Sequence, residues 1–197
     1  MTGIHKHSES RGFTLLEVMV VLFVIGLITS LVTFNSSDRK AQDDTQKFGK
    51  QLAVVMNLYR DEAVYRNLDL GLAMDVNELL LLAFQDVRRL EVSTGKSSDE
   101  LQKLADNPWQ PYASETLKAP AVPEGMALML TLDGKEVDFE DLLDDDDKPL
   151  PALEFLSADE YTPFELTLEH SSDTSFAILL HGDGFNPVWS ELVRYED

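Results

Sequence analysis

The apolar residues of this chain change their spacing along its length. From residue 13 to residue 34 the chain is apolar apart from small polar residues and one charge, Glu17. Polar residues 35–38 follow, and apolar residues then recur at steps of three or four, at Phe48, Leu52, Val55, Tyr59 and Ala63. No proline precedes Pro108. The pattern therefore predicts one long helix from about residue 13 to about residue 65, apolar in its first half and amphipathic in its second.

Beyond residue 67 the spacing changes to two, which is typical of strands. Large apolar side chains alternate here with small or acidic ones, and the apolar positions are Leu68, Leu70, Leu72 and Met74. This alternation predicts a half-buried strand. The length of the apolar run at residues 78–84 fits either a strand or a buried helix, and we favour a strand. Further strands are predicted at residues 126–132, 153–156, 164–170, 176–181 and 189–195.

Turn and capping residues separate these segments. Asp133-Gly134 is a hairpin signal, and further turns are predicted at residues 183–184 and 186–187. Residues 97–106 are typical of a short helix, with Ser98 as the candidate N-cap. A long helix followed by short strands predicts an α+β fold, in which the amphipathic half of the helix packs against antiparallel sheets.

The charge of the chain limits its partners. It has 16 basic and 36 acidic residues, a net charge of -20. Nucleic acid is a poor partner, because binding it depends on basic residues that neutralise phosphates.

The chain has no cysteine, so the fold is not expected to depend on a disulfide. Lys6 and Arg11 precede the apolar segment. Because positive flanks favour the cytoplasmic side, the residues after 34 are expected on the opposite side of a membrane that the segment crosses.

The single acid in the apolar segment needs an explanation. As a helix, residues 13–34 would span roughly 33 Å, which is enough to cross a bilayer. An ionised carboxylate there costs on the order of 2.5 to 3.5 kcal/mol, so Glu17 is expected to have a partner and a task. The apolar run is longer than the core of a secretory signal, and no small-residue cleavage site follows it. The segment therefore fits a signal anchor, cut if anywhere on its N-terminal side, at Gly12.

Residues 12–17, Gly-Phe-Thr-Leu-Leu-Glu, resemble the processing site of type IV pilins and of the pseudopilins of type II secretion. The resemblance implies that residues 1–12 are a leader, that a prepilin peptidase cuts between Gly12 and Phe13, and that it methylates the new Phe13 amine. Glu17 then lies one helical turn from that amine, on the same face. In this family the acid also meets the corresponding amine of a neighbouring subunit. The alternative, a tolerated acid that snorkels outward, leaves Gly12 and Phe13 unexplained.

Several later segments resemble the H-type minor pseudopilin in particular, namely residues 61–63, 66–72, 109–111, 154–156 and 162–168. This implies a pilin-like fold with residues 13–34 in the inner membrane, residues 35–66 as the periplasmic half of the helix and residues 67–197 as a β-rich periplasmic domain. Residues 87–106 and 138–148 depart from the pattern.

The implied function is that of a filament subunit. The resemblance implies that, in the periplasmic pseudopilus, it links the minor subunits of the tip to the shaft of major pseudopilins, for export of folded proteins across the outer membrane. The prepilin peptidase, the other pseudopilins and the inner-membrane assembly platform are the implied partners. The alternative is a minor pilin of a type IV pilus, for adhesion or DNA uptake.

Other candidate sites are weaker. The acidic run 144–147 could coordinate calcium, but consecutive like charges favour a solvated loop. His170 and His181 stand at ends of predicted strands without paired acids at ligand spacing, which favours surface residues over metal ligands. Trp109 and Trp189 fit either partner-facing hot spots or core positions, and we favour the core. A membrane-tethered enzyme is a third possible class of function. The chain offers no catalytic motif, and we expect no catalytic residues, cofactor or metal.

Overall fold

The computed structural model describes residues 15–75, 78–114, 116–144 and 148–195, except for the side chains of residues 29–39. The chain divides into two compact units, residues 1–39 and residues 40–197. The described backbone of the first unit is helical from Leu15 onward. The second unit contains all the described strands and the hydrophobic core.

The helix α1 spans Leu15–Arg66, close to the predicted range. Asn67 ends it with a φ of +48°, a left-handed conformation that asparagine adopts more readily than most residues. The Asn67 amide donates to the Val64 carbonyl at 3.2 Å. The Leu68 amide donates to the Ala63 carbonyl at 3.0 Å. These two bonds form a Schellman cap, which satisfies carbonyls that the end of a helix leaves without partners.

The amphipathic half of α1 buries one face. Its central buried side chains follow steps of three or four: Phe48, Leu52, Met56, Tyr59 and Ala63. The prediction placed Val55 in this face, but Met56 is the fully buried residue and Val55 is only partly buried. At 100° per residue, Met56 lies nearer the centre of the buried face and Val55 lies at its edge.

Four antiparallel strands form the first sheet, in the order β3-β2-β1-β6. The strands are β1 Leu70–Met74, β2 Leu79–Phe84, β3 Trp109–Pro111 and β6 Leu153–Phe155. The strand favoured for the apolar run at 78–84 is thus confirmed. The sequence did not predict β3, because its proline indicated a turn. A proline is accommodated there because β3 is an edge strand of this sheet.

Strand β1 is buried on both faces, so the prediction of a half-buried strand is wrong. Its leucines and methionine occupy one face, and Gly71 and Ala73 occupy the other. A Cβ atom at Gly71 would lie 2.6 Å from Pro151 and 2.9 Å from the ring of Trp109. Small residues on the second face therefore let a proline and a tryptophan cover the strand.

Five antiparallel strands form the second sheet, in the order β5-β4-β7-β8-β9. They are β4 Met126–Leu132, β5 Lys135–Glu136, β7 Phe164–His170, β8 Asp173–Gly182 and β9 Trp189–Arg194. Asp133 and Gly134 both have positive φ, +49° and +73°, as a tight two-residue hairpin requires. The hairpin prediction is confirmed, and the predicted strands differ from the observed ones only near their ends.

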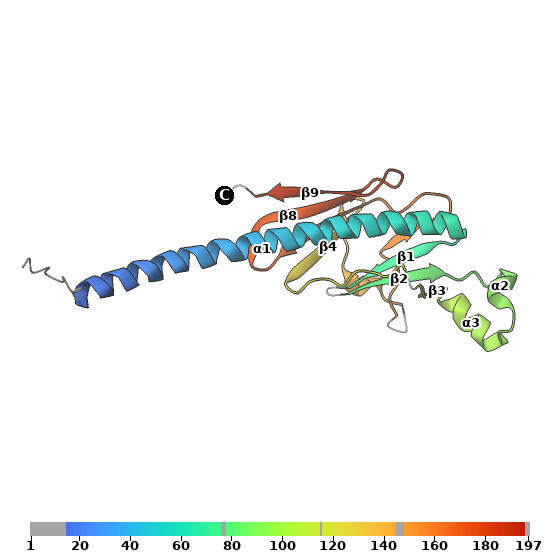
Figure 1. The fold of residues 1–197 in the computed structure, drawn as a ribbon. Coiled ribbons are helices and arrows are strands. Elements are labelled where there is room, and N and C mark those ends of the chain that lie inside the picture. The colour runs from blue at the N-terminus through green and yellow to red at the C-terminus, as the bar shows by residue number, and fades with distance from the viewer. Residues whose placement is uncertain (1–14, 76–77, 115, 145–147, 196–197) are drawn as a thin grey trace, which may run out of the picture. The chain divides into compact units, whose positions relative to one another are not determined.

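Both sheets share one core with residues 40–66 of α1, and Figure 1 shows strands of each sheet beside this part of the helix. The approach is close at Gly49, where a Cβ atom would lie 2.7 Å from the Ile178 side chain and 3.3 Å from that of Leu168. The structure therefore confirms the α+β fold, with a helix packed on antiparallel sheets.

The segment that departs from the pattern at residues 87–106 forms two short helices, α2 Leu90–Ser93 and α3 Ser98–Asp106. A 3-10 helix, η1 Phe139–Leu142, lies in the other departing segment. The N-cap of α3 is Ser97, not the predicted Ser98. Ser97 has the extended backbone that a cap needs and exchanges hydrogen bonds with Glu100, three residues on, in a capping box.

Tyr59→Phe is expected to raise the free energy of unfolding by about 1 kcal/mol. The Tyr59 side chain is fully buried, and its hydroxyl has no hydrogen-bond partner within the described part of the chain. Urea denaturation of the purified chain in detergent measures the change. Tyr112→Phe is the control and should lower stability, because the Tyr112 hydroxyl donates to Glu62 at 2.8 Å. A loss of stability in Tyr59→Phe would contradict this account of the core.

Candidate assembly surface

The described part of the first unit is an exposed apolar helix. All side chains of residues 15–28 are exposed. The large apolar ones are Leu15, Leu16, Val18, Met19, Val20, Val21, Leu22, Phe23, Val24, Ile25, Leu27 and Ile28. Soluble monomers rarely expose an apolar patch larger than a few hundred Å², and a helix that is apolar on all sides is normally buried in protein or lipid. This segment therefore needs a cover of lipid or of other protein chains.

Glu17 is the charged residue of this segment. It lies in the first turn of α1, and its side chain is exposed. Gly12 and Phe13, the predicted cleavage pair, lie outside the described residues, so the pairing of Glu17 with the Phe13 amine stays a prediction. Within the described residues, no helix has both the length and the apolar character that a membrane crossing requires.

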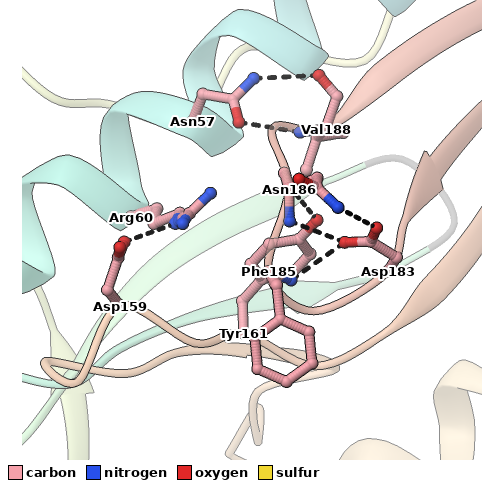
Figure 2. A network of polar contacts seen from close by, with 8 residues as sticks. All are labelled: Asn57, Arg60, Asp159, Tyr161, Asp183, Phe185, Asn186 and Val188. Atoms are coloured by element: carbon pink, nitrogen blue, oxygen red, sulfur yellow. Dashed lines mark hydrogen bonds and ion pairs between the residues drawn. The ribbon is translucent and has the colours of Figure 1, made fainter.

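In the second unit, the turn between β8 and β9 is fixed to α1. The side chain of Asn57 accepts a hydrogen bond from the Val188 amide at 2.9 Å and donates one to the Val188 carbonyl at 3.0 Å. Figure 2 shows this pair of bonds between the helix and the turn. Because Val188 is 5% exposed, the asparagine satisfies two backbone groups that water reaches poorly.

Within the turn, Asp183 is the main acceptor. Its carboxylate accepts hydrogen bonds from the amides of Phe185 and Asn186, at 3.0 and 2.7 Å, and from the Asn186 side chain at 2.7 Å. These bonds, chiefly that from the Asn186 side chain, lower the pKa of Asp183 to about 2. Because the pKa is depressed in the folded chain, this stabilisation is present above roughly pH 4 and is lost as the pH falls through the folded value.

A second set of contacts joins this turn to the loop between β6 and β7. The Tyr161 hydroxyl donates to the Asn186 carbonyl, and the Tyr161 amide donates to the Gly184 carbonyl at 3.0 Å. Arg60 of α1 forms a 2.7 Å ion pair with Asp159 and lies 5.7 Å from the centre of the Tyr161 ring. These side chains converge from the helix and two loops (Figure 2). The turn is therefore held from two sides.

Asn57→Ala is expected to lower the free energy of unfolding by about 2 to 4 kcal/mol, because it leaves both backbone groups of Val188 unpaired in a buried position. Hydrogen exchange at the Val188 amide should accelerate in parallel. The matched control is Gln51→Ala on an exposed position of the same helix, which should change stability by less than about 0.5 kcal/mol. Equal effects of the two substitutions would contradict the role of Asn57.

His181 stands between two acids of neighbouring strands. Its Nδ1 lies 3.5 Å from Glu165 Oε2 on β7, and its Nε2 lies 3.2 Å from Glu191 Oε1 on β9. The prediction that His181 has no paired acids is therefore wrong. The acids are distant in sequence, and the pairing of the strands brings them close to the histidine. The described residues contain no group of three or more histidine, cysteine or acidic side chains placed to hold a metal ion.

The two tryptophans differ in burial. Trp109 is half-buried and packs edge-on against Phe84, with ring centres 5.3 Å apart. Trp189 is 52% exposed and stacks on His181, with ring centres 4.5 Å apart. The core prediction is wrong for Trp189, because it stands on the edge strand β9 and pairs with His181 on the sheet face away from the core.

Comparison with known proteins shows which protein families this chain is similar to. Residues 8–33 match the family model of the prokaryotic N-terminal methylation motif. The type II secretion system protein H of Pseudomonas aeruginosa is 26% identical over 185 residues, which covers 94% of this chain and 98% of that protein. Protein H of Vibrio cholerae is 27% identical over 182 residues, which covers 82% of this chain and 83% of that protein.

The type II secretion system core protein G of Aeromonas hydrophila is 31% identical over 114 residues, which covers 55% of this chain and 74% of that protein. The chain belongs to the pseudopilins of type II secretion. A solved structure of the minor pseudopilin EpsH from the type 2 secretion system of Vibrio cholerae aligns with this pseudopilin with a TM-score of 0.47, at 19% identity, over 78% of this chain and 96% of that chain.

The methylation motif of this pseudopilin contains Gly12, Phe13 and Glu17, which all fall within the matched residues 8–33. The chain thus carries a prepilin-type N-terminus, which implies processing by a prepilin peptidase. The bond that is cut and the separate roles of the three residues are not tested by the match and stay predictions.

The acidic run of this pseudopilin is only partly described, because residues 145–147 lie outside the described residues. Asp144 is half-buried. Its carboxylate accepts hydrogen bonds from the Asn107 side chain and from the Lys148 amide, the latter at 2.8 Å. Asp144 is therefore a local acceptor that joins this loop to the residue after α3, a role that the sequence alone does not reveal.

Proposed function

We propose that this pseudopilin is the H-type minor subunit of the pseudopilus, which links the minor subunits of the tip to the shaft of major subunits. The observation that carries the proposal is the extent of similarity: protein H of P. aeruginosa matches over 94% of this chain and 98% of its own length. Similarity to core protein G of A. hydrophila covers 55% of this chain. In this role the subunit supports the export of folded proteins across the outer membrane.

Processing creates the assembly contact. A prepilin peptidase cuts between Gly12 and Phe13 and methylates the Phe13 amine. This amine is positive at the start of the helix, and Glu17 lies one turn away, within reach of its own amine and of the amine of a neighbouring subunit. Away from water such a pair is stronger than at a surface. The contact therefore sets the position at which the subunit enters the filament.

The membrane holds the subunit before assembly. Residues 13–34 cross the inner membrane, with the N-terminus in the cytoplasm and residues 35–197 in the periplasm. Lys6 and Arg11 precede the segment and support this orientation, because positive flanks stay on the cytoplasmic side. The assembly platform of the inner membrane then delivers the subunit to the pseudopilus.

The exposed apolar helix explains how the subunit passes from membrane to filament. Residues 15–28 expose apolar side chains on all sides, so either lipid tails or the helices of other subunits can cover them. Moving from one apolar environment to another costs little hydrophobic energy. Glu17 then favours the filament, because only a neighbouring subunit offers it a second amine.

A minor pilin of a surface type IV pilus is the less favoured alternative, because the curated relatives that match are named as type II secretion proteins. The role is structural: the subunit acts by assembly, and no catalytic step is assigned to it.

Deletion of the gene for this pseudopilin tests the proposal. Folded exoproteins should accumulate in the periplasm and disappear from the medium, because a filament without its linking subunit does not drive export. A plasmid copy of the chain should restore secretion. Normal secretion together with a loss of surface pili would contradict the proposal and favour the alternative.

A further inference from the structure

Two large aromatic side chains are exposed where β8 turns into β9. Phe185 is 64% exposed and Trp189 is 52% exposed. Strand β9 is an edge strand of the second sheet, so the turn and its aromatics lie at a border of that sheet. Exposed aromatic residues are enriched at the centres of protein interfaces, where they fill pockets of the partner.

Hydrogen bonds within the chain hold the backbone that carries these aromatics. The Asp183 carboxylate accepts a hydrogen bond from the Phe185 amide. The Asn57 side chain forms hydrogen bonds with both the amide and the carbonyl of Val188, the residue before Trp189. Figure 2 shows Phe185 within this network. A side chain on a fixed backbone loses little conformational entropy on binding, so its contact area converts efficiently into affinity.

Carboxylates lie near both aromatic residues. Glu165 and Glu191 flank His181, which stacks on Trp189, and their side chains are 47% and 48% exposed. Asp183 adds a third carboxylate beside Phe185. Even a protonated His181 leaves this group net negative. Arg60, the cation of the same network, is paired with Asp159, and its side chain is 15% exposed.

We propose that this hairpin face, made of Phe185, Trp189, Glu165, Glu191 and Asp183, docks a protein partner whose surface carries lysine or arginine around an apolar pocket. The charges argue for this occupant. An anionic lipid surface would be repelled by the three carboxylates, and a second copy of the chain would bring the same acids against them. This docking would involve the globular unit and not the exposed apolar helix.

Photocrosslinking of the full chain in its own cells tests the docking. The photoreactive residue p-benzoylphenylalanine replaces Phe185 in one variant, Trp189 in a second, and Leu90 of α2, an exposed apolar control, in a third. The expected result is one crosslinked protein that is shared by positions 185 and 189 and absent at position 90. Mass spectrometry should place the crosslink in a segment of the partner that contains lysine or arginine.

Charge reversal then separates docking from chance proximity. Glu165→Lys with Glu191→Lys should reduce crosslinking from position 185 by about tenfold, since like charges would then meet. Glu136→Lys on β5, at the opposite edge of the same sheet, should leave the yield unchanged. Thermal unfolding of the purified variants checks that each is folded.

Four results would overturn the proposal: no crosslink above the position 90 control, crosslinks to lipid or to another copy of this chain, a partner segment without basic residues, or equal effects of the Glu136 and Glu165/Glu191 reversals. The crosslinking result tests the docking proposal whichever protein the partner is. The deletion experiment scores secretion alone, so the docking proposal and the proposed function can fail independently.

Discussion

Glu17→Leu is expected to reduce incorporation of the subunit into pseudopili by about tenfold or more, because it removes the anionic half of the proposed ion pair, which would form away from water. The apolar replacement fits the membrane at least as well as glutamate does, so the precursor should still insert and be processed. Quantitative immunoblotting of purified pseudopili, relative to the membrane pool of the same chain, measures the change.

The control for this substitution lies one turn further along the helix. Val21 is exposed on the same face as Glu17, and Val21→Leu adds a methylene group without changing charge. This variant should enter pseudopili at the wild-type level. If Glu17→Leu also did so, the acid would be a tolerated surface charge and the assembly contact would have to lie elsewhere.

Gly12→Val is expected to leave the leader attached, because a β-branched side chain at the cleavage position obstructs a peptidase that cuts after glycine. The Phe13 nitrogen then stays in an amide bond without charge, and the proposed contact with Glu17 cannot form. Incorporation should fall as far as in Glu17→Leu. The mass of the N-terminal peptide reports the leader, and immunoblotting of pseudopili reports incorporation.

Two comparisons sharpen this second experiment. Gly26→Val changes a glycine of the same apolar segment, where an added Cβ would meet no atom within 4 Å apart from the neighbouring residues and the nearby backbone of the helix itself. This variant should be processed normally. The double variant Gly12→Val with Glu17→Leu should be no worse than either single variant, because both remove the same interaction. Complete processing of Gly12→Val would contradict the assigned cleavage site.

Periodic patterns in the sequence predicted most of the fold. The 3.6-residue spacing from Phe48 to Ala63 identified the buried face of α1, and alternation or apolar runs located β2, β4 and β7. These elements were predictable because side-chain direction follows directly from position in a helix or strand. The small residues of β1 misled the prediction, since the side chains that cover them come from distant segments.

The hairpin face was not predictable by the same reasoning. His181 meets Glu165 and Glu191 only because β7, β8 and β9 pair in one register, and register depends on the whole sheet. Asn57 gave no signal in the sequence, because its partner is the backbone of Val188. The proposed contact of Glu17 with a neighbouring amine needs a second subunit, which no property of one chain can supply. Its prediction rests on the cost of an acid in an apolar helix and on family resemblance.

The most direct test of the central claim is the N-terminal peptide of this chain in purified pseudopili, identified by mass spectrometry. We expect the chain to be present in smaller amounts than the major subunit, with an N-terminal peptide that begins at Phe13 and carries a methylated amine. A chain that is absent from pseudopili, or present with residues 1–12 still attached, would contradict its role as a processed filament subunit.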